Sequence, residues 1–119
     1  MALRTVVWAA SARAELRGLP KEVRTKLGRA LYLVQLGDVP QNVKRLHGSL
    51  RDVHEIIETS SSGTFRLAFA WIGDVVYGLY AFKKKSRSGI STPQEDLELI
   101  ARRYRKARKD HFEKAGGRW

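Results

Sequence analysis

The sequence contains no cysteine and no long apolar run. Without cysteine, the chain can form no disulfide framework and offers no thiolate as a nucleophile or metal ligand. No apolar segment approaches the ~20 residues that a membrane-spanning helix needs, and the segment Met1-Ala2-Leu3-Arg4 does not begin a signal-peptide core. We therefore expect a cytoplasmic protein with no membrane-spanning segment.

Acidic residues are also scarce, with 12 Asp and Glu against 23 Lys and Arg, for a formal net charge of +11. In a chain of 119 residues, this excess indicates a polyanionic partner, either nucleic acid or an anionic membrane surface. The hydrophobic fraction of 43% is typical of a globular protein. The length suits a single domain over residues 1–119, in which we expect residues 113–119 to form a loose tail.

The first 40 residues predict one strand and two helices. Residues 4–8 have a strand pattern. Ser11 can cap a short helix that Gly18 ends, and Pro20 begins a second helix that runs to about Leu36. Apolar residues recur in this second helix at the spacing of one buried face, namely Val23, Leu27, Ala30, Leu31 and Val34.

The middle of the chain predicts a polar connection over residues 41–52, followed by strands over residues 53–59 and 64–71. Alternate residues of the latter strand, Phe65, Leu67, Phe69 and Trp71, share one face and are expected to build the core. The other face carries Arg66 among small residues, and we expect it to be partly open.

The stretch from Asp74 to Arg87 begins as an apolar run, which is typical of a buried strand that forms a hairpin with the preceding one. The run then changes abruptly to cations, Lys83, Lys84, Lys85 and Arg87. A rigid strand that carries fixed positive charges to a surface is well suited to hold a phosphate.

A last helix has a clear start signal, with Thr92 as N-cap, Pro93 as first residue and Glu95 as capping-box partner. Its apolar face holds Leu97, Ile100, Ala101 and Tyr104, and its second half is strongly basic. The order β-α-α-β-β-β-α predicts an α+β fold. In it, a small, mainly antiparallel sheet carries a helical hairpin on one face and is followed by a C-terminal helix.

Several motifs over about residues 50–105 together resemble the phage-derived HigB-like toxins of the RelE/ParE toxin superfamily. The resemblance is carried by Phe65-Arg66, by the strand from Val76 to Lys85, by Gly89-Ile90-Ser91-Thr92-Pro93 and by Asp96-Leu97-Glu98-Leu99-Ile100. Tyr80 stands where many relatives have His, and Ile57 stands where an Arg is common. The resemblance implies a RelE-like fold.

It also implies the toxin of a type II toxin–antitoxin system. Such a toxin cleaves mRNA as a metal-independent endoribonuclease, usually on the ribosome, needs no cofactor, and is neutralised by a helix-turn-helix antitoxin. Two other functions fit the same residues: inhibition of DNA gyrase, as in the ParE branch, and binding of nucleic acid without catalysis.

RNA cleavage of this kind needs a base, an acid and cations around the phosphate. The planar fork of Arg66 can bond two phosphate oxygens, although a cross-strand pair with Glu55 or Glu58 is the structural alternative. Lys83 and Lys84 alternate in direction, so only one can share the Arg66 face, and we favour Lys84. The remaining catalytic candidates are Tyr80, His54 and Glu55, each of which could instead be an ordinary strand residue.

The RNA-binding candidates are basic residues that flank this site. They are Lys44, Arg45 and Arg51 in the polar connection, Lys85 and Arg87 after the strand, and Arg102, Arg105, Lys106, Arg108 and Lys109 in the last helix. The histidines outside the strands have no partners at metal-ligand spacing, so no metal site is expected.

Overall fold

The computed structural model describes residues 3–84 and 92–116, and it has the predicted α+β architecture. Its elements are β1 (Thr5–Trp8), α1 (Ala12–Arg17), α2 (Lys21–Gln35), β2 (Val43–Arg45), the short 3-10 helix η1 (Gly48–Leu50), β3 (Val53–Ser60), β4 (Gly63–Ile72), β5 (Val75–Lys83) and α3 (Gln94–Gly116). The predicted order of elements lacks β2, and it is wrong there, because Val43–Arg45 within the predicted polar connection over residues 41–52 pairs with β3 and extends the sheet.

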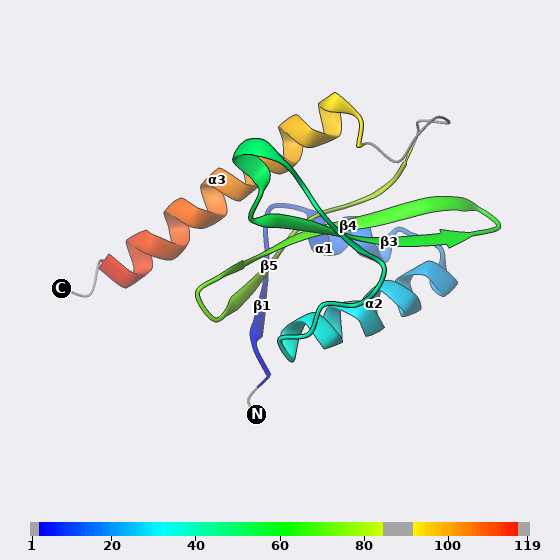
Figure 1. The fold of residues 1–119 in the computed structure, drawn as a ribbon, viewed down its shortest axis with the longest axis horizontal. Coiled ribbons are helices and arrows are strands. Elements are labelled where there is room, and N and C mark those ends of the chain that lie inside the picture. Colours follow the sequence, from blue (N-terminus) through cyan, green and yellow to red (C-terminus); the bar gives the residue numbers. More distant parts are fainter. Residues whose placement is uncertain (1–2, 85–91, 117–119) are drawn as a thin grey trace.

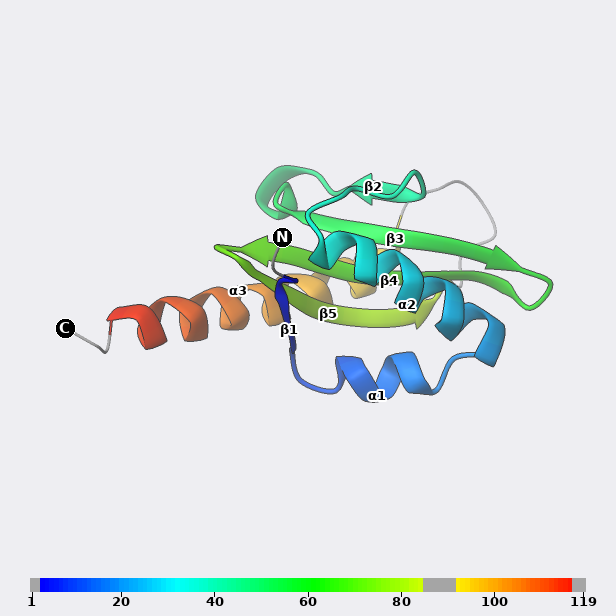
Figure 2. The same ribbon diagram turned by 90° about the horizontal axis from the view of Figure 1, so that it is seen from below.

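The strands form one sheet in the order β1-β5-β4-β3-β2. All neighbouring strands are antiparallel except β1, which runs parallel to β5. Helix α2 covers one face of the sheet and α3 crosses the other, while α1 lies beside β5 (Figures 1 and 2). The C-terminal part of α3 extends past the sheet (Figure 1), so that the molecule is 51 Å long but only 24 Å thick.

The core between α2 and the sheet follows the predicted pattern. The apolar face of α2 packs against Phe65, Leu67 and Phe69 of β4, with Trp71 at the margin. Trp8 reaches this core across Gly78, where a Cβ atom would lie 2.4 Å from the indole ring. The glycine therefore allows β1 and β5 to lie side by side with a large aromatic ring between them and α2.

A second core lies between α3 and the opposite face of the sheet, and it corrects the expectation of an open face. Ala68 and Ala70 are fully buried there, because Ile100, Tyr104 and Ala107 of α3 pack over them. Leu46, which precedes η1, and Leu50, the last residue of η1, complete this core. The small residues of β4 thus make room for a helix and not for an open substrate surface.

A β-bulge interrupts the pairing of β4 with β5. Ala68 pairs with Tyr80 but Phe69 pairs with Gly78, which leaves Leu79 as the extra residue of β5. Leu79 and Tyr80 consequently both pack on the α3 side, and Ala81 packs on the α2 side. Beyond the bulge, the alternation of β5 is therefore shifted by one residue, so that even-numbered residues such as Tyr80 and Phe82 face α3.

Both ends of α3 differ from the prediction. The helix begins at Gln94, so that Pro93 and not Thr92 precedes its first residue. The predicted loose tail is wrong over residues 113–116, which belong to α3, and residues 117–119 lie outside the described residues. Among the described helices, none has the length and apolar character needed to cross a membrane.

Candidate functional site

Glu55, Arg66 and Thr92 form a hydrogen-bonded group between the sheet and the start of α3. Nη1 of Arg66 donates to Oε1 of Glu55 at 2.8 Å and to Oγ1 of Thr92 at 2.9 Å. The Thr92 hydroxyl lies 2.9 Å from both carboxylate oxygens of Glu55. Arg66 and Glu55 are 2% and 0% exposed. Arg66 is thus held in the cross-strand ion pair that the sequence offered as its structural alternative.

The strand register explains this pairing. Arg66 lies opposite Ile57 and Glu55 opposite Ala68, so the two charged residues are diagonal neighbours on the same face of β3 and β4. Glu58, the other predicted partner, instead accepts a hydrogen bond from Asn42 at 3.2 Å. Removal of either residue would leave the other charge buried without its counter-charge, which strongly destabilises a folded protein.

Two lysines extend this group towards the surface. Lys84 follows the end of β5, and Lys44 lies opposite Glu55 in β2. Loss of hydration lowers the pKa of Lys84, and the positive charges of Arg66 and Lys44 lower it further, while Glu55 has the opposite effect. Lys44, Arg66 and Lys84 therefore form one cluster of cations, which we call the basic cluster.

Lys83 points away from this cluster. Its ammonium lies 5.9 Å from the centre of the Phe65 ring, on the α2 side of the sheet. The prediction that only one of the two lysines shares the Arg66 face is confirmed, and the bulge in β5 makes that residue Lys84. The other predicted cations of this stretch, Lys85 and Arg87, lie outside the described residues.

Tyr80 lies on the α3 side of the sheet, where it contacts Asp96 and Phe82. Its hydroxyl donates to Oδ1 of Asp96 at 3.1 Å, and its ring stacks on Phe82 with the ring centres 4.5 Å apart. Burial and the hydrogen bond to Asp96 raise the pKa of Tyr80 to about 12. The hydroxyl is therefore protonated at neutral pH, and its proton is directed to Asp96.

Arg103 covers the edge of β5 beyond the end of β1. It bonds both carboxylate oxygens of Glu15 at 2.8 Å and the carbonyl oxygen of Leu79 at 2.9 Å. Glu15 in turn accepts the N–H of Ala81 at 3.3 Å. This pair joins α1, β5 and α3 and satisfies backbone groups that would otherwise form an open sheet edge.

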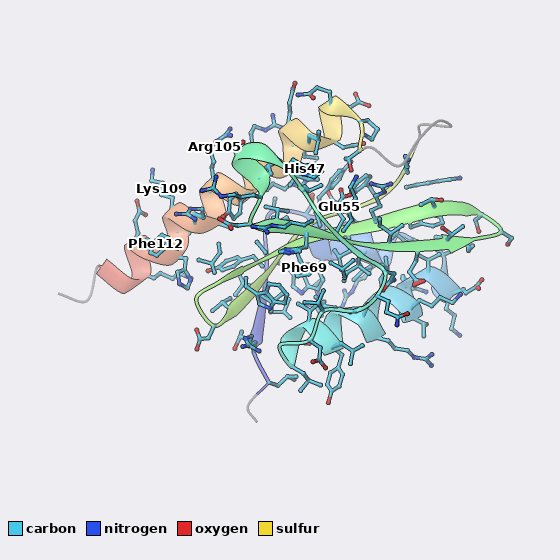
Figure 3. The ribbon with its side chains drawn as sticks, viewed as in Figure 1. His47, Glu55, Phe69, Arg105, Lys109 and Phe112 are labelled. Carbon is cyan, nitrogen blue, oxygen red and sulfur yellow. The ribbon has the colours of Figure 1, made fainter. Side chains whose placement is uncertain are left out.

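The structure does not bring His54 together with Arg66. His54 lies on the α2 side of β3, against Phe69 and Trp71, with ring centres 5.6 and 5.4 Å apart. Figure 3 shows the two sides of the sheet, with Glu55 towards α3 and Phe69 towards α2. Burial, followed by the charge of Arg45, lowers the pKa of His54.

A groove between η1 and α3 opens beside the basic cluster. It has a volume of about 420 Å³, and Lys44 and Thr92 lie at its wall. A second hollow of about 340 Å³ shares Ser49, Leu50 and Ala101 with it. The two hollows adjoin along α3 through these shared residues, and we call them together the η1–α3 groove.

The predicted RNA-binding residues divide between this groove and other surfaces. Arg51, Arg105 and Arg108 line its far part, and Figure 3 shows Arg105 on the same side of α3 as His47. Nε of Arg45 donates to the carbonyl oxygen of Arg51 at 2.6 Å. Lys106 lines a separate hollow near β1, and Arg102 and Lys109 are exposed. The groove also contains residues that were not predicted, namely His47, Ser49, Gln94 and Glu98.

Comparison with protein families identifies the group to which the chain belongs. Residues 14–105 match the family described as phage-derived protein Gp49-like (DUF891). The chain is a member of the Gp49-like family. No curated protein sequence matches it.

Solved structures show that this Gp49-like protein shares its fold with RelE. A mutant of the toxin RelE from E. coli in the free state is 19% identical, with a TM-score of 0.59, and the match covers 88% of this chain and 98% of RelE. The isolated E. coli RelE toxin is 22% identical with a TM-score of 0.54, and 83% and 97% are covered.

A similar match is the toxin–antitoxin complex RelBE2 from Mycobacterium tuberculosis. It is 20% identical with a TM-score of 0.51, and the match covers 69% of this chain and 99% of that one. These likenesses confirm the predicted fold.

Proposed function

We propose that this Gp49-like protein is the toxin of a toxin–antitoxin pair and that it cleaves mRNA as a metal-independent endoribonuclease. The observation that carries the proposal is the basic cluster, in which Lys84 and Lys44 lie beside Arg66 at the end of an open groove. The shared fold with RelE and RelBE proteins supports the same reading. The resemblance of the sequence to HigB-like toxins suggests that branch of the superfamily.

The chemistry needs no cofactor. The ribose 2′-hydroxyl attacks the adjacent phosphorus, its proton is removed, the bond to the 5′ oxygen breaks, and that oxygen takes up a proton. Positive groups fixed around the phosphate stabilise the charge that develops in the transition state. The two lysines of the basic cluster, which lie next to the buried pair of Arg66 and Glu55, match this requirement.

We assign different roles to the three cations. Lys84 and Lys44, which are half-buried, contact the scissile phosphate, and Lys84 donates the proton to the leaving oxygen. Its lowered pKa makes it a better acid than an ordinary lysine. Arg66 is a positioning residue. Its buried hydrogen bonds to Glu55 and Thr92 hold together the strands and the start of α3 next to which the two lysines lie.

The test is cleavage of mRNA by the purified protein, with and without ribosomes. Lys84→Ala should lower the rate by roughly two to three orders of magnitude, which is the usual loss for a group that stabilises charge in the transition state. Lys83→Ala is the matched control, since Lys83 is the neighbouring lysine on the other face. Equal losses in the two variants would contradict the assigned site.

The partners follow from the same proposal. The substrate is mRNA, with the ribosome as its platform in the cytoplasm, and the cognate antitoxin is a helix-turn-helix protein encoded beside the toxin. Growth arrest on expression, relieved by coexpression of that neighbour, is expected. Inhibition of DNA supercoiling without RNA cleavage would instead favour a gyrase inhibitor, and binding of RNA without either effect would favour a non-catalytic protein.

A further inference from the structure

The part of the η1–α3 groove nearest the basic cluster has an apolar floor and a polar rim. Leu46 and Leu50 are buried at its base, and Leu97 and Ala101 of α3 line it. His47, Gln94 and Glu98 are exposed at its edge. A volume of about 420 Å³ with this lining is typical of a site for a small, flat, partly apolar group that is oriented by a few polar contacts.

The position of the groove indicates which group that is. Lys44 and Thr92 belong both to the groove and to the surroundings of Arg66 and Glu55. A phosphate held by Lys44 and Lys84 would therefore lie at the mouth of the groove, and the base attached to a neighbouring sugar would lie within reach of its floor. Single-stranded RNA exposes bases in this way, and proteins bind them by stacking and by hydrogen bonds to their edges.

Charge separates this part of the groove from the path of the phosphates. Arg51, Arg105 and Arg108 line the adjoining hollow, where they outnumber the one carboxylate of Asp52, and can bind backbone phosphates. The near part contains the carboxylate of Glu98 instead, which repels a phosphate but can accept hydrogen bonds from a base. Nε2 of Gln94 donates to Oε1 of Glu98 at 3.4 Å, so the two exposed side chains lie together at the rim.

We propose that the η1–α3 groove binds one nucleobase next to the scissile phosphate and that Glu98 selects bases with an amino group over uracil. The inference rests on the proposed cleavage of RNA. An ionised carboxylate accepts hydrogen bonds and cannot donate them, so it pairs with the amino groups of adenine, cytosine or guanine. The pairing edge of uracil presents two carbonyl oxygens around a single N–H, and these oxygens face the carboxylate unfavourably.

The experiment uses the full-length protein and an RNA pool that is randomised around the cleavage position, with the cut ends read by sequencing. Glu98→Gln should raise cleavage at sites with uracil by about tenfold relative to the other bases, the size of one lost discriminating contact, since glutamine can also donate. Glu95→Gln is the matched control, because Glu95 is exposed on the same helix and outside the groove. It should leave the base profile unchanged.

A second variant tests occupancy of the groove by shape alone. Ala101→Phe fills the floor and should lower cleavage at least about tenfold in a protein that its melting curve shows to be folded, whereas Leu99→Phe on the same helix should keep the native rate. If the native protein cleaves RNA and Glu98→Gln leaves the base profile unchanged, the groove does not read a base and this inference is overturned. If the native protein cleaves no RNA, the proposed function itself fails. Variants that lose only neutralisation by the antitoxin would identify the groove as a protein-binding surface and would also overturn the inference.

Discussion

The hydroxyl of Thr92 lies 2.9 Å from each carboxylate oxygen of Glu55, and this contact joins the start of α3 to the centre of β3. The same hydroxyl accepts a hydrogen bond from Arg66. A residue with the sequence signature of a helix cap therefore serves as the third member of a buried polar group. Together with the apolar packing of α3, this contact holds the start of the helix over the sheet and so one wall of the η1–α3 groove.

Thr92→Val is the first test of that dependence. The variant keeps the shape of the side chain but leaves Glu55 and Arg66 each without one buried hydrogen bond, which should cost about 1–3 kcal/mol of unfolding free energy. Urea unfolding measures the loss. Thr25→Val is the control, because the Thr25 hydroxyl donates to the Lys21 carbonyl oxygen on the exposed side of α2. A loss of the same size in both variants would show that the buried group contributes nothing special.

The buried ion pair should show strong energetic coupling. Arg66→Met leaves the carboxylate of Glu55 buried beside Thr92, and Glu55→Gln leaves the guanidinium of Arg66 without its counter-charge, so each should cost about 3–5 kcal/mol. The double variant should be more stable than the sum of the two losses predicts, by more than about 1 kcal/mol. Strictly additive losses, measured in the same urea series, would mean that the two residues act independently.

The lowered pKa of Lys84 predicts the pH dependence of cleavage. If Lys84 donates a proton, activity must fall as the pH rises through its pKa, and this fall should occur below the ordinary value of 10.5. Lys84→Arg keeps the positive charge but cannot release a proton in this range, so it should be slower and should lack the alkaline fall. The measurement is the rate of RNA cleavage against pH. An identical alkaline fall in both proteins would assign the proton to another group.

His54 should make the fold sensitive to acid. Burial lowers its pKa in the folded protein below the ordinary value of 6.5, so the unfolded chain binds the proton more tightly. Stability should therefore decrease as the pH falls below about 6.5 and continue to decrease until the folded-state pKa is passed. His54→Phe, which can keep the contacts with Phe69 and Trp71, should remove this decrease between roughly pH 5 and 8. The exposed His47→Gln variant should retain it.

Salt dependence should distinguish the two sides of α3. Arg105 and Arg108 line the η1–α3 groove, so replacing both by Gln should make the slope of log affinity for RNA against log salt less steep by about 1.4, from two phosphate contacts. Lys106 and Lys114 line the hollow near β1, and their replacement by Gln removes the same charge from the other side of the helix. Equal changes in slope would mean that the groove is not the path of the RNA backbone.

The sequence by itself determined the class of the fold, the three α-helices of the described residues and most of the first core. Alternation in β4 and helical spacing in α2 are local patterns. They predicted that Phe65, Leu67 and Phe69 contact α2, and the structure confirms these contacts. The charge excess and the change from apolar to basic residues at the end of β5 likewise led to the basic cluster. Such patterns can be recognised in a sequence because they depend only on the periodicity of side chains along a single strand or helix.

Only the tertiary structure decided what covers the other face of the sheet. A face of alanines with one arginine fits an open surface as well as it fits a packed helix, and the choice was made by α3, which lies more than 20 residues away in the chain. The bulge at Leu79 could not be predicted from local sequence either, since it arises from the pairing of two strands. It nevertheless determines that Lys84, and not Lys83, lies on the same face of the sheet as Arg66. The groove combines residues of η1 and α3 that are separated by about 45 positions, and no local pattern brings such residues together.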